Sequence, residues 1–107
     1  WKILQYKNPD DWVIATNKEH TVKKFLEIVS KKLDINIKWV GKGIKEKGIN
    51  KKTGKVIIDL NQKYFRPSEV DFLKGDFSKA KKLLKWKPGI STNQLIDDMI
   101  NQELSNY

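Results

Sequence analysis

Apolar side chains recur at helical spacing between residues 21 and 33. Thr21 is suited to cap this helix, because its hydroxyl can accept a hydrogen bond from a first-turn amide. The lysines of the stretch fall elsewhere on the helical wheel and form a solvated face. The pattern therefore predicts an amphipathic helix with one apolar stripe, made of Val22, Phe25, Leu26, Val29 and Leu33.

Two further helices are predicted in the last third of the sequence. Asp76 can cap a helix that runs to Leu84 and turns Ala80, Leu83 and Leu84 inward. Ser91 and Gln94 have the spacing of a capping box and begin the last helix. The apolar face of that helix is expected to contain Leu95, Ile96, Met99, Ile100 and Leu104.

Shorter apolar runs predict strands. Residues 12–15 form a continuous apolar run typical of a buried strand, whereas residues 35–39 alternate as in a half-buried one. Residues 44–50 and 55–60 flank a turn in which Gly54 supplies positive φ, which predicts a hairpin. Residues 1–5 are expected to end a helix. The predicted fold class is α/β, as a small mixed unit that spans residues 1–107.

The length and composition allow one compact unit with a modest core. The chain has 107 residues and no cysteine, so neither a disulfide framework nor a thiolate metal site is expected. A reducing cytoplasm fits this composition. Neither an apolar run of membrane-spanning length nor a signal-peptide pattern is present, so no membrane partner is expected. The first residue is Trp1 rather than Met, as expected of a fragment or a processed product.

The net charge of +9 raises a nucleic-acid-binding module as an alternative function. The lysines, however, are scattered from Lys2 to Lys87 rather than gathered in one stripe. Readers of base edges also favour arginine, of which this chain has one. A solvated surface is the more economical interpretation, and no nucleic-acid partner is predicted.

The remaining candidates for chemistry have simpler structural interpretations. His20 is the only histidine and has no visible catalytic or metal-binding partner in the sequence, so it is expected to cap or pack at the start of a helix. Trp12, Trp39 and Trp86 lie within predicted elements and are expected to pack in the core. We therefore predict no catalytic residue and no metal site in this chain.

Arg66 is the only arginine among 22 Lys and Arg residues. Its planar fork can hold a phosphate or carboxylate in a bidentate way that lysine cannot. Pro67 favours an extended Arg66 and can open a helical turn, which would put Arg66 and Glu69 on one side. Such a pair suits a nucleotide, with Arg66 at the pyrophosphate and Glu69 at ribose hydroxyls. A local ion pair is the alternative interpretation.

Several segments together resemble a known family. They are YFRPSEVD at residues 64–71, GDFSKA at 75–80 and LKWKP at 84–88, with VIAT at 13–16 and HTV at 20–22. In this order and spacing they resemble the C-terminal portion of GDP-mannose 4,6-dehydratases, which are extended short-chain dehydrogenases/reductases. The family usually has Gly where this chain has Lys85, and a side chain there disfavours a left-handed helix cap.

The resemblance implies a function. Enzymes of this family remove water from GDP-mannose to give a 4-keto-6-deoxy sugar, using bound NADP, on the route to GDP-fucose. It further implies that Arg66 contacts the GDP phosphates, that Glu69 contacts ribose hydroxyls, and that the complete enzyme is a homo-oligomer. Another nucleotide-sugar dehydratase or epimerase remains an alternative.

Two parts of such an enzyme are missing from the sequence. It contains no G-x-x-G-x-x-G turn after a strand for the dinucleotide, and no Tyr-x-x-x-Lys pair. We therefore interpret the chain as the substrate-binding lobe without its Rossmann half, where NADP would bind. Such a lobe is predicted to be inactive alone, and no residue of it is predicted to bind the cofactor.

Overall fold

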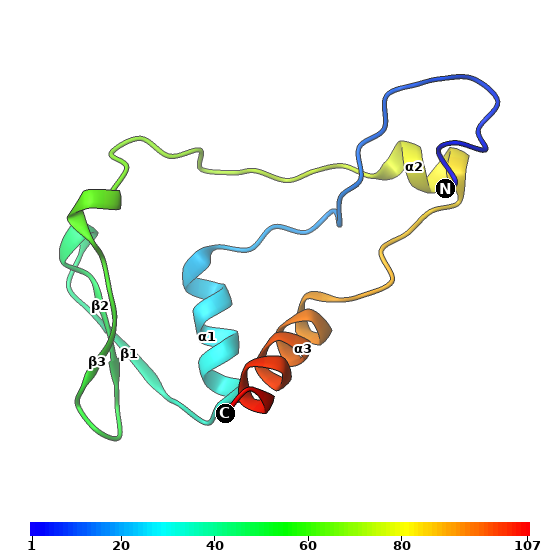
Figure 1. Cartoon of the computed structure of the whole chain (residues 1–107). Helices are drawn as coiled ribbons and strands as arrows, with labels where there is room; N and C mark the ends of the chain where they lie inside the picture. The colour runs from blue at the N-terminus through cyan, green and yellow to red at the C-terminus, as the bar shows by residue number, and fades with distance from the viewer.

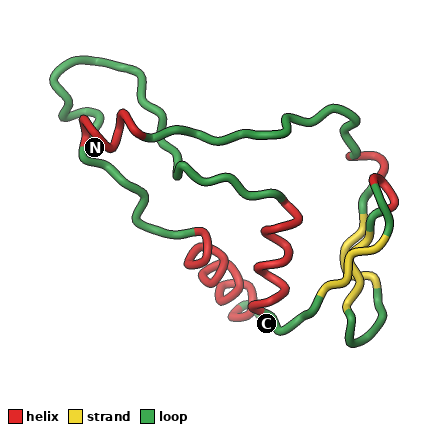
Figure 2. Tube along the Cα trace, turned by 180° about the vertical axis from the view of Figure 1, so that it is seen from behind, coloured by secondary structure: helices red, strands yellow, loops and turns green.

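Three groups of elements lie apart from one another in the structure, a computed structural model that describes residues 1–107 (Figure 1). A three-stranded sheet, the pair α1 and α3, and α2 with the N-terminal residues occupy separate regions, and the view from behind shows the same separation (Figure 2). The predicted mixed α/β class is confirmed. In chain order the helices and strands are α1 (Val22–Lys32), β1 (Ile37–Val40), β2 (Lys47–Asn50), β3 (Val56–Asp59), α2 (Ser78–Leu84) and α3 (Thr92–Ser105).

Helices α1 and α3 form where local capping signals predict them. The Thr21 hydroxyl accepts a hydrogen bond of 3.0 Å from the Lys24 amide, and Ser91 and Gln94 make both bonds of a capping box. The two helices pack along an apolar groove of about 280 Å³, with Ile96 buried beneath it. Val22, predicted to lie on the apolar stripe, is instead 77% exposed at the first turn of α1. No helix of the chain is long and apolar enough to cross a membrane.

The sheet is an antiparallel meander in the order β1-β2-β3. The predicted hairpin is confirmed, with Gly54 at φ 71° in its turn. Gly48 pairs with Trp39, and a Cβ at Gly48 would lie 3.2 Å from the Trp39 ring and 3.0 Å from Ile58 Cβ. Glycine at this position therefore lets the Trp39 ring and the Ile58 side chain approach the middle strand.

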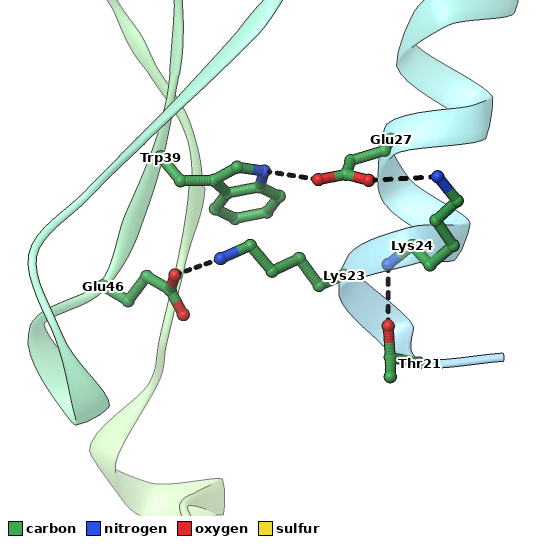
Figure 3. A network of polar contacts seen from close by, with 6 residues as sticks. All are labelled: Thr21, Lys23, Lys24, Glu27, Trp39 and Glu46. Carbon is green, nitrogen blue, oxygen red and sulfur yellow. Dashed lines mark hydrogen bonds and ion pairs between the residues drawn. The ribbon is translucent and has the colours of Figure 1, made fainter.

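Polar contacts rather than an apolar core join the sheet to α1 (Figure 3). The Trp39 indole N–H donates to Glu27 Oε1 at 3.2 Å, and Lys23 Nζ lies 2.5 Å from Glu46 Oε1. Lys23 also lies 4.7 Å from the centre of the Trp39 ring, in cation–π geometry. Lys24 pairs more loosely with Glu27, at 3.7 Å. This network therefore sets where the sheet lies relative to α1.

Two sequence predictions fail where the chain offers no neighbour to pack against. Residues 12–15 are extended but form no strand, and Val13 and Ile14 are 54% and 53% exposed. A strand needs a ladder partner, and no other segment of the chain supplies one. Leu83 was expected to turn inward, yet it is exposed while Ala80 and Leu84 are buried. Residues 1–5 make one hydrogen-bonded turn, from the Gln5 amide to the Trp1 carbonyl.

The accessible surface of the chain is large for its length. It measures 9492 Å², whereas a folded monomer of this mass exposes about 6,200 Å². The radius of gyration is 18.7 Å, against about 13 Å for a compact domain of this length. Only three apolar side chains are buried, those of Ala80, Leu84 and Ile96. The chain thus builds local contacts but no common core.

At the C-terminal end of α2, backbone strain at Lys85 opposes the hydrogen bonds that cap the helix. Lys85 adopts the left-handed conformation (φ 53°, ψ 32°) that its side chain disfavours, because its own amide and that of Trp86 both reach the Ala80 carbonyl. Lys85→Gly should relieve this strain and stabilise α2 by about 1 kcal/mol. Lys82→Gly, an exposed control within α2, should destabilise the helix by about the same amount. Hydrogen-exchange protection of the α2 amides measures both, and equal signs for the two variants would contradict the account.

Candidate functional site

Arg66 and Glu69, the candidate binding pair, lie in a long exposed segment that follows the sheet. A short 3-10 turn, Gln62–Tyr64, is closed by Asn61, whose side chain accepts from the Lys63 amide at 3.0 Å. Residues 65–77 then run as an extended connection with neither helix nor strand, the green-to-yellow segment of Figure 1. The helical turn predicted after Pro67 is therefore wrong. Proline holds the preceding residue extended, and residues 67–71 are all exposed, without packing that would stabilise a turn.

Arg66 and Glu69 nevertheless lie on the same side of this segment. Arg66 Nε is 4.0 Å from Glu69 Oε1, and the two side chains are 78% and 66% exposed. At this distance the contact is an ion pair without a hydrogen bond, and an exposed pair of this kind contributes at most about 1 kcal/mol. Neither side chain makes another ion pair or hydrogen bond in the structure. The two charged groups can therefore rearrange around a ligand with little loss of stability.

The far end of the exposed segment is anchored to the loop that precedes α1. Gly75 packs so closely on this loop that a Cβ there would lie 2.5 Å from Ala15 Cβ. Two residues later the Phe77 amide donates to Asn17 Oδ1 at 2.8 Å, across 60 residues of sequence. Asn17 itself has φ 55°. Sequence reasoning did not single out Asn17, because no local signal connects it to Phe77.

Two carboxylates fix the start of α2 near this anchor. The Asp76 carboxylate accepts from the amide and the hydroxyl of Ser78, at 2.8 and 2.5 Å, and these bonds lower the pKa of Asp76. The ion-paired hydrogen bond from Lys79, at 2.7 Å, lowers the pKa of Asp10, and the Asp11 amide adds to that effect. Lys79 also lies 5.0 Å from the centre of the Trp12 ring. Residues 10–12 are thereby attached to α2.

His20 is exposed, Trp12 and Trp86 do not lie in a core as expected, and each of the three makes a side-chain contact instead. His20 Nε2 lies 3.0 Å from the Thr92 hydroxyl and so links the loop before α1 to the first residue of α3. Trp12 packs edge-on against Tyr6, and Trp86 does so against Phe77. These tryptophans are half-buried rather than enclosed. No group of three or more His, Cys, Asp or Glu side chains in the chain could hold a metal ion.

Comparison with known proteins finds the same family over nearly the whole chain. A family model described as "GDP-mannose 4,6 dehydratase" matches residues 1–99. The chain is 45% identical over 104 residues to the GDP-mannose 4,6 dehydratase of Dictyostelium discoideum, 44% to that of Drosophila melanogaster and 42% to that of Homo sapiens. Each alignment covers 97% of this chain but only 29%, 26% and 28% of the respective relative. The chain thus spans under a third of the length of these relatives.

The hydrogen bonds of Asp76 predict how acid affects α2. Because the folded-state pKa of Asp76 is below the ordinary value of 3.8, its stabilising effect is fully present above about pH 4 and is lost as the pH falls through the folded-state pKa. The Ser78 amide resonance should report this transition in an NMR titration. In Asp76→Asn the transition should vanish, whereas the exposed control Asp98→Asn should keep it. An unchanged Ser78 titration in Asp76→Asn would contradict the assignment.

Proposed function

We propose, since the chain belongs to the GDP-mannose 4,6-dehydratase family, that it is the GDP-sugar-binding C-terminal part of such an enzyme. Family membership follows from the match over residues 1–99 and from relatives aligned over 97% of the chain. The observation that carries the proposal for this part is the exposed Arg66–Glu69 pair on its extended segment. The substrate of the complete enzyme would be GDP-mannose, and its product GDP-4-keto-6-deoxymannose and water.

The chemistry of the pair suits a nucleoside diphosphate sugar. The Arg66 guanidinium can donate two parallel hydrogen bonds to one phosphate. The Glu69 carboxylate can accept hydrogen bonds from the two ribose hydroxyls. On binding, Arg66 would exchange a weak, solvated ion pair for charge-assisted hydrogen bonds. The role of this chain is therefore to bind and orient the nucleotide part of the substrate. The sugar that reacts would lie away from Arg66 and Glu69.

NADP, which supplies hydride transfer in the reaction expected of the family, does not fit the residues of this chain. A dinucleotide site needs a glycine-rich turn between a strand and a helix. The one connection here from a strand to an α-helix, residues 60–77, contains a single glycine, Gly75, and that glycine packs against Ala15. The cofactor is therefore assigned to the rest of the enzyme. A cytoplasmic location and a homo-oligomeric complete enzyme also stay predictions.

Of the alternatives, another nucleotide-sugar enzyme is less well supported, because the three relatives compared all carry dehydratase names. The nucleic-acid alternative gains no support from the structure. Lys23, Lys24, Lys32, Lys47 and Lys79 each pair with a carboxylate. Lysines in such pairs are partly neutralised.

The chain alone should not turn over GDP-mannose. It contains neither a dinucleotide turn nor a Tyr-x-x-x-Lys pair. Incubation of the purified chain with GDP-mannose and NADP should therefore yield no 4-keto product in a chromatographic assay, whereas a full-length relative serves as the positive control. Turnover by the isolated chain would refute its assignment as a binding part.

A second prediction concerns the guanidinium group of Arg66. Arg66→Lys keeps the charge but loses the bidentate geometry. A charge-assisted hydrogen bond contributes on the order of 1.5–3 kcal/mol, so GDP-mannose binding should weaken about tenfold or more. Arg66→Ala should weaken it further, and Glu69→Gln less, since an amide still accepts one hydroxyl. The melting temperature should hardly change, because the ion pair is exposed.

The measurement is calorimetric titration of GDP-mannose into a full-length chimera, in which this chain replaces the aligned 104 residues of the Dictyostelium relative. Lys63→Arg, which adds an equivalent fork on the 3-10 turn just before the segment, is the control and should leave the affinity unchanged. Unchanged affinity in Arg66→Lys, or a loss confined to the melting temperature, would show that Arg66 is structural.

A further inference from the structure

We propose that the outer face of the three-stranded sheet, together with its two loops, binds an acidic, extended segment of another protein. The segment would present carboxylates to lysines at both ends of the sheet and an apolar side chain to the middle of the face. This surface takes no part in the proposed nucleotide site, so its partner would be additional to the proposed function.

The fold gathers on this sheet most of the positive charge of the chain. Residues 38–55 contain seven lysines and one carboxylate, so they carry +6 of the net charge of +9. One of the seven, Lys47, pairs with Asp59 at 3.9 Å. A surface of one sign without its own counter-charges attracts a partner of the opposite sign. The other six lysines are exposed, pair with no carboxylate and make up what we term the basic sheet surface: Lys38, Lys42, Lys45, Lys51, Lys52 and Lys55.

The strand register places these lysines in two groups, one at each end of the sheet. The lysines of residues 51–55 lie in the β2–β3 turn, and those of residues 42–45 lie in the β1–β2 connection at the opposite end (Figure 1). Lys38 extends the first group onto the sheet, because its partner Ile49 is next to the last residue pair before the turn. The strands between the two groups are four residues long, which corresponds to about 13 Å.

The face of the sheet between the two groups is apolar and is turned away from α1. Trp39 and its partner Gly48 lie on the inner face, where Trp39 contacts Glu27 of α1 (Figure 3). Side chains alternate between the two faces along a strand, so Ile49 and its partner Val56 lie on the outer face. Val56 is 50% exposed. The outer face therefore offers a small apolar area between two groups of cations.

An extended acidic segment fits this arrangement. Every second side chain of an extended chain points to the same side, at intervals of about 7 Å. The first, third and fifth residues of a Glu-x-Leu-x-Glu segment would therefore span about 13 Å on one side. They would present a carboxylate to each group of lysines and a leucine to Ile49 and Val56. The pair of Lys47 with Asp59 shows that the outer face already accepts a carboxylate among its lysines.

Other polyanions match the basic sheet surface less well. Nucleic-acid readers combine phosphate contacts with arginine or with aromatic stacking. Residues 38–55 contain no arginine, and Trp39, their only aromatic residue, faces α1. Attachment to an anionic membrane needs buried apolar surface besides lysines, but the tip of the hairpin consists of Lys51, Lys52, Thr53 and Gly54. Protein carboxylates are therefore the anions that the surface fits.

The test is an NMR titration of the isotope-labelled chain with a peptide built from the unit Glu-Ser-Leu-Ser-Glu. The amide resonances of residues 38–56 should shift on binding, whereas those of α2 should not. A counterpart peptide with lysine in place of each glutamate should not bind. Binding of that counterpart, or shifts spread evenly over the chain, would overturn the proposal. So would tighter binding to phosphatidylserine vesicles or to poly(U) RNA in parallel titrations.

Two matched double variants locate the binding. Lys51→Gln/Lys52→Gln removes two exposed, unpaired cations from the turn, and Lys81→Gln/Lys82→Gln removes two such cations from α2. The first should weaken binding of the acidic peptide about 3- to 10-fold, as expected for two exposed ion pairs, and the second less than about twofold. The Trp39 indole resonance, which reports the contact with Glu27, is the control for an intact sheet. Equal weakening by both variants would show that the peptide responds only to net charge and would overturn the proposal.

Discussion

Burial of apolar surface is the constraint on which this structure depends, because the chain alone satisfies it only in separate places. Ile96 is covered where α3 packs on α1, whereas Ala80 and Leu84 are buried in α2, beside the N-terminal turn. These contacts do not merge into one core, so each group of elements keeps its own small apolar contact. The extended connections between them, including the segment with Arg66, consequently remain in solvent.

Polar contacts take over where apolar packing is missing. The sheet is held to α1 by Trp39, Glu27, Lys23 and Glu46 (Figure 3). The Asp10 carboxylate pairs with Lys79 and so holds the N-terminal residues to the start of α2. Such partly exposed ion pairs are individually weak and are screened by salt. They orient elements more than they stabilise them. A chain of this kind is suited to complete its packing on a larger body, and the proposed nucleotide site would become rigid only then.

The sequence predicted features that depend on neighbouring residues. The caps at Thr21 and Ser91 and the positive φ of Gly54 were predicted because the groups that satisfy them lie within a few residues. The contact from Asn17 to Phe77 was not, since it joins residues 60 positions apart. The buried strand at residues 12–15 was predicted from a pattern that suits surroundings the chain does not itself provide.

At the candidate site, too, the feature set by neighbouring residues was predicted correctly and the feature that needs distant packing was not. The spacing of Arg66 and Glu69 correctly indicated that the two side chains lie together, whereas the helical turn expected between them needed packing that is missing. At Lys85 the local preference was overridden, because the left-handed conformation brings the Trp86 amide to the Ala80 carbonyl.

Small-angle scattering of the isolated chain, extrapolated to zero concentration, tests the central claim most directly. The account predicts a radius of gyration near the 18.7 Å of the open structure, well below the roughly 33 Å of an unfolded chain of this length. A value near 13 Å, expected of a compact domain, would show that the chain closes its own core and would contradict the account.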